Sequence, residues 1–186
     1  MNEEDALRRA RNGDAAGLDE LLADARPRAL RIVTAMIDDP EEAQDVFQET
    51  CRRVQEDLAR FEGRSAFSTW VCGIALNLAR RVLRDRARHA RPADPAALEG
   101  AGRGRGVLSS IYARELAANL ESAVHQLPES LKEAFVLHYL EGLDYEEVSR
   151  ITGVGVRALY VRAHRAKALL RQTLGSVVDT FWTERG

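Results

Sequence analysis

The segment from Leu140 to Arg171 constrains the fold most, because it has the pattern of two short helices joined by a tight turn. Asp144 can cap the first helix, with Glu147 three residues on, and this reciprocal pair satisfies two amides at a helix start. Gly153 stands where a residue in the left-handed conformation commonly ends a helix. The spacing therefore predicts a helix-turn-helix.

The second helix of this pair has one apolar and one basic face. Its apolar residues fall three or four positions apart, so we expect one stripe to pack inward: Val156, Leu159, Ala163, Ala166 and Leu170. The opposite face carries Arg157, Tyr160, Arg162, Arg165 and Lys167. Residues 150–171 hold six Arg or Lys and no acid, in a chain whose net charge is -2. A slim basic helix fits the major groove of DNA, and the alternative is a solvated basic surface.

Composition indicates an intracellular chain of one domain or two small ones. Its 186 residues can bury a sufficient core without crosslinks. The two cysteines, Cys51 and Cys72, each lie in an apolar helical stripe without a second thiol or a histidine at ligand spacing, which predicts reduced core residues. The N-terminus lacks the order of a signal peptide, and no apolar run has the length of a membrane span. We expect a cytoplasmic protein without membrane insertion.

Charge is unevenly distributed along the chain. Residues 1–50 hold thirteen acids against six Arg, whereas residues 60–91 hold eight Arg against two acids. Two basic zones, one early and one late, are thus separated by neutral or acidic sequence. This asymmetry favours contact with nucleic acid at two places and a protein partner elsewhere.

Nearly every periodic segment has helical spacing, which predicts an all-α fold. Residues 91–106 collect two Pro and four Gly with almost no large apolar side chain, the composition of a flexible linker. We therefore expect two small helical domains, over residues 1–90 and 111–186, joined by a linker over residues 91–110.

Two strong helices are predicted in the first domain. One begins at Asp39, with Pro40 at the first helical position and Glu42 completing a capping box. Its predicted core stripe is Ala43, Val46, Phe47, Cys51, Val54 and Leu58. The face turned away is polar and could be plain solvent surface: Gln44, Asp45, Gln48, Glu49, Arg52 and Arg53.

The other helix is predicted from Phe67 to Arg88, and a short loop with an aromatic at each end precedes it. We expect it to bury Val71, Ile74, Leu78 and Val82, while Asn77, Arg80, Arg81 and Arg84 project elsewhere. We expect the rings of Phe61 and Phe67 to be partly buried and so to hold the loop in place. Small polar residues between aromatics, followed by an arginine-rich helix, also suit a pocket for an unstacked base beside a phosphate track.

The second domain is predicted to add helices over residues 112–126 and from Pro128, the latter with Leu131, Phe135 and Leu140 in the core. His125 and His138 are interpreted as surface or capping residues rather than ligands. The chain shows no Ser, His and Asp set, phosphate-binding glycine loop or metal-ligand spacing. We expect no catalytic residues, no cofactor and no metal, hence no enzyme.

The two halves resemble a known family in the right order. DPEEAQDVFQETCRRV and FEGRSAFSTWVCGIALNLARRVLRDRAR resemble region 2 of the extracytoplasmic-function group of bacterial sigma-70 factors, the promoter-specificity subunits of RNA polymerase. LPESLKEAFVLHYLEGLDYEEVSRITGVGVRALYVRAHRAK resembles region 4. The resemblance covers most of residues 15–172.

The resemblance implies a role for each of three residue sets. Those matching the polymerase-binding surface are Asp45, Gln48, Glu49 and Arg52. Those matching the segment that captures and melts the minus-ten element are Arg64, Ser65, Phe67, Ser68, Trp70, Asn77, Arg80, Arg81 and Arg84. Those matching the helix that reads the minus-thirty-five element are Arg157, Tyr160, Val161, Arg162, His164, Arg165 and Lys167.

The implied partners are core RNA polymerase, through its beta-prime clamp helices and beta flap, promoter DNA, and an anti-sigma factor. Two other readings are a stand-alone helix-turn-helix regulator and a sigma-like interaction protein that reads no promoter. Gly155 and Tyr160 depart from the family pattern where bases would be read, and Gly73 stands where the family often has a bulky or basic residue.

Overall fold

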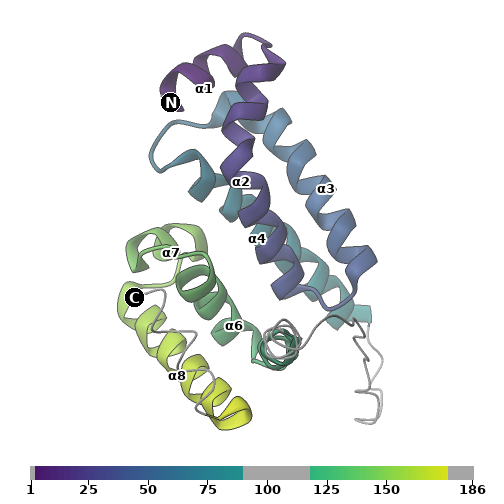
Figure 1. Cartoon of the computed structure of the whole chain (residues 1–186), viewed down its shortest axis with the longest axis vertical. Coiled ribbons are helices and arrows are strands. Elements are labelled where there is room, and N and C mark those ends of the chain that lie inside the picture. The colour runs from purple at the N-terminus through teal and green to yellow at the C-terminus, as the bar shows by residue number, and fades with distance from the viewer. Residues whose placement is uncertain (1–2, 90–117, 176–186) are drawn as a thin grey trace, which may run out of the picture.

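The computed structural model describes residues 3–89 and 118–175, and within these ranges the chain is helical without strands. The first domain contains α1 (Glu3–Arg11), α2 (Ala15–Met36), α3 (Pro40–Asp57), the 3-10 turn η1 (Leu58–Arg60) and α4 (Phe67–His89). The second contains a helix over residues 118–125, then α6 (Glu129–Phe135), the π-helical turn η2 (Val136–Leu140), α7 (Tyr145–Thr152) and α8 (Val156–Leu174). The predicted all-α fold is confirmed (Figure 1).

The long helix α2 is the centre of the first domain, and sequence reasoning missed both it and α1. The Asp14 side chain caps α2 by accepting a hydrogen bond from the Ala16 amide at 3.0 Å. The helix contacts α1, α3 and α4 (Figure 1). Its inner face is buried at helical spacing: Leu21, Leu22, Ala25, Ala29, Ile32, Val33 and Met36. A cap followed by this spacing is a signal that the sequence did contain.

Helix α3 begins as predicted, but its capping box is incomplete. Asp39 Oδ1 accepts hydrogen bonds from the amides of Glu41 at 2.9 Å and Glu42 at 3.2 Å. The Glu42 side chain pairs instead with Arg86 of α4, because that helix passes beside the start of α3. The prediction that Glu42 completes a capping box was therefore wrong.

Burial on α3 and α4 differs in detail from the predicted stripes. On α3, Thr50 is buried and donates its hydroxyl to the Val46 carbonyl at 2.8 Å, whereas Phe47 and Cys51 are half-buried. On α4, Val71 is buried as predicted, but Ile74, Leu78 and Val82 are only half-buried. Small residues take the inner positions there, since α4 lies between two helices of its own domain and α7: Cys72, Ala75 and Ala79.

The predicted helix-turn-helix is confirmed at its caps. Glu147 N donates to Asp144 Oδ1 at 2.7 Å and Asp144 N donates to Glu147 Oε2 at 3.1 Å, so the capping box is complete. Gly153 ends α7 with φ 72°. On α8 the inward stripe is buried except Val156 in the first turn, which is 38% exposed.

Several predictions lie outside the described residues. These are the linker, the exact domain boundaries and most of the helix predicted over residues 112–126, of which the described part, 118–125, is helical. Where the structure describes the chain, no helix is both long and apolar enough to cross a membrane.

The two domains pack against each other. Helix α7 contacts α4, while α6 and η2 contact α2, and the buried apolar side chains of both domains form one continuous cluster (Figure 1). The surfaces of α4 and α7 that face each other are therefore covered in this arrangement.

Candidate nucleic-acid interface

Three aromatic rings hold the loop before α4. The ring centroids of Phe61 and Phe67 are 5.4 Å apart at 89°, and Trp70 lies 5.2 Å from Phe61 and 5.6 Å from Phe67. Edge-to-face packing of this kind is favourable for aromatic rings. Phe61 is 3% and Phe67 1% exposed, so both are core residues, whereas Trp70 is half-buried. Of the two aromatic residues predicted to contact the minus-ten element, Phe67 and Trp70, only Trp70 keeps ring surface outside the core.

A pocket of about 400 Å³ opens beside this cluster. Residues of both domains line it: Arg64, Ser65, Thr69, Trp70, Gly73, Ile74, Asn77, Arg150 and Ile151. Four of the residues predicted to contact the minus-ten element are thus brought together, namely Arg64, Ser65, Trp70 and Asn77. The pocket combines an indole face with hydroxyl, amide and guanidinium groups, the chemistry that a displaced base and its phosphate need.

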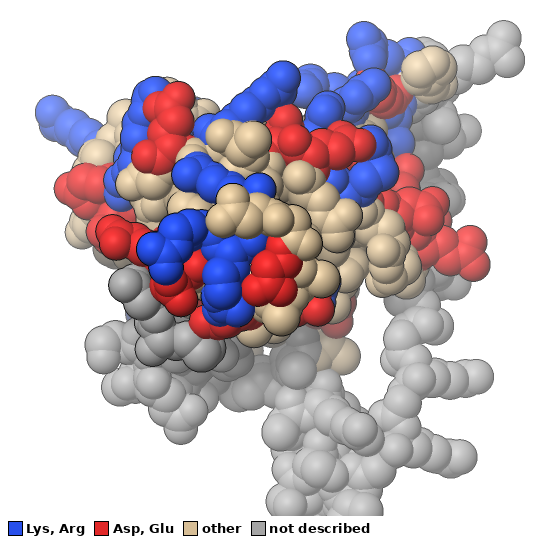
Figure 2. All heavy atoms as spheres, turned by 90° about the horizontal axis from the view of Figure 1, so that it is seen from above, with Lys and Arg blue, Asp and Glu red and all other residues tan. Residues whose placement is uncertain are grey.

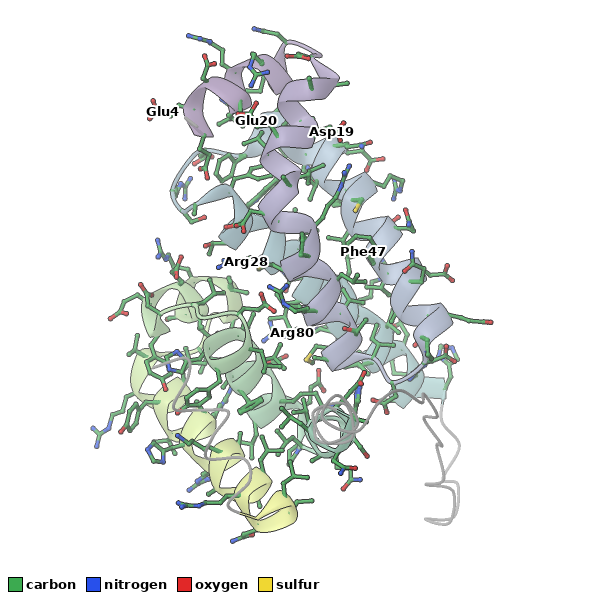
Figure 3. All side chains as sticks on the ribbon, in the orientation of Figure 1. Glu4, Asp19, Glu20, Arg28, Phe47 and Arg80 are labelled. Carbon is green, nitrogen blue, oxygen red and sulfur yellow. The ribbon has the colours of Figure 1, made fainter. Side chains whose placement is uncertain are left out.

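The arginines of α4 differ in accessibility. Asn77, Arg81 and Arg84 are exposed, whereas the Arg80 side chain is 17% exposed and is held by the second domain. Arg80 Nη2 donates to Glu133 Oε2 at 2.6 Å, and Nε binds the other oxygen. This hydrogen bonding raises the pKa of Arg80, and Figure 3 shows the side chain between the two groups of helices.

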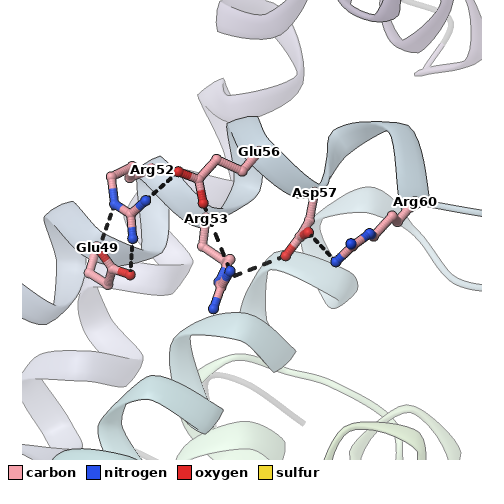
Figure 4. Close-up of polar contacts among 6 residues, drawn as sticks. All are labelled: Glu49, Arg52, Arg53, Glu56, Asp57 and Arg60. Carbon is pink, nitrogen blue, oxygen red and sulfur yellow. Dashed lines mark hydrogen bonds and ion pairs between the residues drawn. The ribbon is translucent and has the colours of Figure 1, made fainter.

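The predicted polymerase-binding residues form an exposed charged stripe on α3. Asp45, Gln48 and Arg52 are exposed, and Glu49 is half-buried at the edge of the stripe. Arg52 Nε donates to Glu49 Oε2 at 2.8 Å, and the guanidinium also reaches Glu56 (Figure 4). The Arg52 hydrogen bonds lower the pKa of Glu49. Arg53, Asp57 and Arg60 extend the network toward η1 (Figure 4).

The predicted recognition helix presents its reading residues to solvent. Arg157, Tyr160, Val161, His164 and Arg165 are exposed, with Tyr160 at 52%. Arg162 and Lys167 are half-buried, and Lys167 Nζ lies 5.5 Å from the centroid of the Tyr139 ring. The face combines basic groups with one exposed aromatic ring, as a groove-binding helix does.

Sequence reasoning missed a series of rings that ties the helix-turn-helix together. The His138 and Tyr145 rings stack with centroids 4.0 Å apart, and the series continues from Tyr145 to Tyr160 at 5.8 Å and to His164 at 5.4 Å. His138 Nδ1 lies 2.8 Å from the Leu143 carbonyl oxygen, so this nitrogen carries the hydrogen. Burial raises the pKa of Tyr145 to about 12, which keeps its hydroxyl neutral. The spacing of these residues in the chain has no single period, so no pattern marks them.

Charge is mixed at the end of the molecule that carries α1. Figure 2 looks down on the end of the molecule that carries α1, where basic and acidic side chains alternate. Arg8 pairs there with Asp5, and Arg9 with Glu20. In the described ranges no three His, Cys, Asp or Glu side chains are grouped so that they could hold a metal ion. The one-signed surface is therefore on α8 rather than at this end.

Comparison with known families supports the division into two halves. A family model described as sigma-70 region 2 matches residues 21–89. A second, described as sigma-70 region 4, matches residues 117–170. The first range spans α2 to α4 and the second contains the helix-turn-helix.

Curated relatives match over nearly the full length. The RNA polymerase sigma-H factor of Pseudomonas aeruginosa is 30% identical over 176 residues, which cover 90% of this chain and 91% of the relative. The ECF RNA polymerase sigma-E factor of Haemophilus influenzae is 25% identical over 182 residues, covering 94% and 96%. Among solved structures, the sigma factor RpoE in complex with the anti-sigma factor NepR from Bartonella quintana has a TM-score of 0.71 at 21% identity, covering 84% and 96%, and supports the fold.

Proposed function

Because this chain belongs to the extracytoplasmic-function group of the sigma-70 family, we propose that it works as an alternative sigma factor. It binds core RNA polymerase and directs transcription initiation to a particular class of promoters. The observation that carries the proposal is the presence, in one chain, of an exposed basic helix-turn-helix and of a separate domain whose loop and arginine-bearing helix contribute Arg64, Trp70 and Asn77 to a polar pocket. A stand-alone regulator would need only the former.

We assign minus-ten recognition to the first domain, over residues 1–90. Flipping a base out of the stack costs a few kcal/mol, on the order of what stacking and pocket contacts return. Trp70 supplies a ring face, Ser65 and Ser68 supply hydroxyls, and Asn77 supplies an amide near them. Arg64, Arg80, Arg81 and Arg84 supply positive charge for the phosphates of the same strand. Phe67 acts from the core by fixing the loop.

We assign minus-thirty-five recognition to the second domain, over residues 111–186, with residues 91–110 as the linker. Arginine can grip guanine edges or phosphates, so Arg157 and Arg162 are placed nearest the bases. Arg165, Lys167 and Arg171 then lie along the backbone. Tyr160 can contact a thymine methyl group or a sugar edge, which gives this chain its own sequence preference.

The charged stripe of α3 serves as the docking surface for polymerase. Asp45, Gln48, Glu49 and Arg52 are the residues in contact with the clamp helices of the beta-prime subunit, while the second domain rests on the beta flap. An anti-sigma factor that covers these surfaces would hold the chain inactive. The chain acts in the cytoplasm, where polymerase is, and has no catalytic activity of its own.

Transcription in vitro tests this function. Core polymerase with and without the chain is given a fragmented genomic library, and transcript starts are sequenced. We expect starts that require the chain and share two sequence elements at a fixed spacing. A library that yields no chain-dependent start, with core binding verified by gel filtration, would show that the chain does not direct initiation.

A further inference from the structure

Helix α1 holds both ends of the loop over residues 62–66, which precedes α4 (Figure 1). At one end, the Arg11 guanidinium donates a hydrogen bond from Nη2 to the carbonyl oxygen of Phe61. At the other end, the Phe67 amide donates to Glu3 Oε1 at 3.2 Å. The partners are 50 and 64 positions apart in the sequence, so these contacts connect the loop to a distant part of the chain.

The contact of Glu3 replaces a helix cap that the loop itself does not supply. The Trp70 amide donates to the Ala66 carbonyl at 3.1 Å, so Ala66 occupies the N-cap position of α4. An alanine side chain cannot accept from the free amides of the first turn, and the hydroxyl of Ser65 donates to a carbonyl instead. A carboxylate is also favoured at the N-terminus of a helix by the helix dipole. Glu3 therefore fixes the point at which the loop passes into α4.

Helix α1 can support the loop because it is packed closely on α2. A Cβ atom built on Gly17 would lie 2.8 Å from the Cβ of Arg9 and 2.9 Å from the Ala10 amide nitrogen, so only glycine permits this approach of the two helices. The Arg9 guanidinium also pairs with Glu20 of α2. The two side chains that hold the loop are thus positioned by the core of the first domain.

Between its two ends the loop buries little surface of its own. Its residues are exposed except Ser65, which is half-buried, and Gly63 turns the chain with φ 71°. Arg150 of the second domain donates to the Arg64 carbonyl at 3.2 Å, but this hydrogen bond is exposed to water. A segment with little buried surface opens easily, so the conformation of the loop depends largely on its ends. Arg64 and Ser65, which line the pocket, belong to this segment.

We infer that Glu3 and Arg11 are positioning residues for minus-ten recognition: from α1 they keep Arg64 and Ser65 in the conformation that binds the displaced strand. This inference rests on the proposed function of the loop. A loop that is already in its binding conformation avoids the cost of ordering when the strand binds. The inference gives a role to a helix that ends before residue 21, where the match to sigma-70 region 2 begins.

The substitutions Glu3→Ala and Arg11→Ala each release one end of the loop, and both are tested in the full chain bound to core polymerase. The probe is a fluorescent single strand that carries the minus-ten sequence found by start mapping. If a loop with one free end has its binding conformation for a tenth to a fifth of the time, the holoenzyme should bind this strand about five- to tenfold more weakly. Binding to core polymerase and to a duplex with only the minus-thirty-five element should be unchanged.

Three further variants separate positioning from general stability. Glu3→Gln keeps an oxygen that can accept from the Phe67 amide, so it should recover most of the affinity that Glu3→Ala loses. Arg8→Ala removes an exposed α1 arginine that pairs with Asp5 of the same helix, and it should leave strand binding nearly unchanged. Ala23→Gly lowers the stability of α2 at an exposed position, and it should also leave strand binding nearly unchanged.

Hydrogen exchange at the Phe67 amide, followed by NMR of the full chain, shows whether the end of the loop has been released. We expect faster exchange in Glu3→Ala and almost the original rate in Glu3→Gln. The inference is overturned if exchange in Glu3→Ala is unchanged, or if it is faster and the strand still binds as tightly as before. An equal loss in Ala23→Gly, or an equal loss on the minus-thirty-five duplex, also overturns it. Failure of the proposed function is distinct, since the original holoenzyme would then initiate at no promoter.

Discussion

At the scale of single residues, two glycines that lie two positions apart in the chain have opposite conformational requirements. Gly153 has φ 72°, whereas Gly155 has φ -62° and ψ 143° and begins α8 without a side-chain cap. A Cβ atom at either position would meet no neighbour within 4 Å. Backbone conformation alone therefore decides the effect of a substitution at each.

We expect Gly153→Ala to lower the free energy of unfolding by about 1 kcal/mol, since the left-handed conformation costs that much for a residue with Cβ. Gly155→Ser should raise it by a few tenths of a kcal/mol, because serine is a slightly better N-cap than glycine. Urea unfolding monitored by circular dichroism measures both. Equal effects of the same sign would contradict this assignment of the turn.

Arg162 is the residue that we expect to discriminate bases. Arg162→Ala should weaken holoenzyme binding to its minus-thirty-five element by about 1 to 3 kcal/mol and relax the preference at one position. The comparison variant is Arg171→Ala at the exposed end of α8, which should weaken binding to all sequences alike and reduce the salt slope by about one. Footprinting at matched salt measures both, and unchanged protection in the first variant would remove Arg162 from the site.

At the scale of helices, capping residues were more informative than apolar stripes. Asp39, Asp144 and Gly153 marked three helix ends correctly because each acts through its own local backbone. Burial along α4 was predicted less well, since it depends on how many neighbours the helix has, and the contact with α7 comes from the other domain. The same limit hid Glu133, whose importance comes only from the arginine it meets, Arg80.

Helix α3 combines a buried face with a charged one, and we expect the charged face to be needed for polymerase. The double substitution Asp45→Lys with Glu49→Lys should weaken binding to core polymerase at least about tenfold. The new lysines would face a surface that is complementary to the original acids, and such like-charge contacts cost several kcal/mol. The fold should persist because both residues lie at the surface, although Arg52 loses its partner Glu49.

The control for this prediction is Asp19→Lys with Asp24→Lys, which makes the same change of charge on α2. Both aspartates are exposed and pair with arginines of α2, as Glu49 does with Arg52 of α3, and Figure 3 labels Asp19. A titration with labelled core polymerase compares the two variants. Similar losses in both would point to the net charge of the chain rather than to a docking face.

At the scale of the whole molecule, the contact between the two domains includes a histidine whose protonation affects the stability of the packed arrangement. His125, with a side chain that is 17% exposed, lies beside Asp38 of the first domain, and Lys132 and Glu121 also act on it. Burial lowers the pKa of His125, and this effect outweighs the opposing attraction of Asp38. The packed arrangement therefore favours the neutral ring.

The sign of the resulting pH dependence follows from proton binding. The unfolded chain, with a histidine pKa of about 6.5, takes up this proton before the folded chain does. Above that pH the neutral ring makes its full contribution to the free energy of unfolding. This contribution is lost as the pH falls through the lowered pKa that His125 has in the folded chain. His125→Gln, which keeps a polar side chain but cannot titrate, should reduce the drop in melting temperature between pH 7.5 and pH 5.5. If the original chain and the variant lose the same stability over that interval, the acid sensitivity has its origin in the carboxylates, and the contact between the domains does not respond to pH through His125.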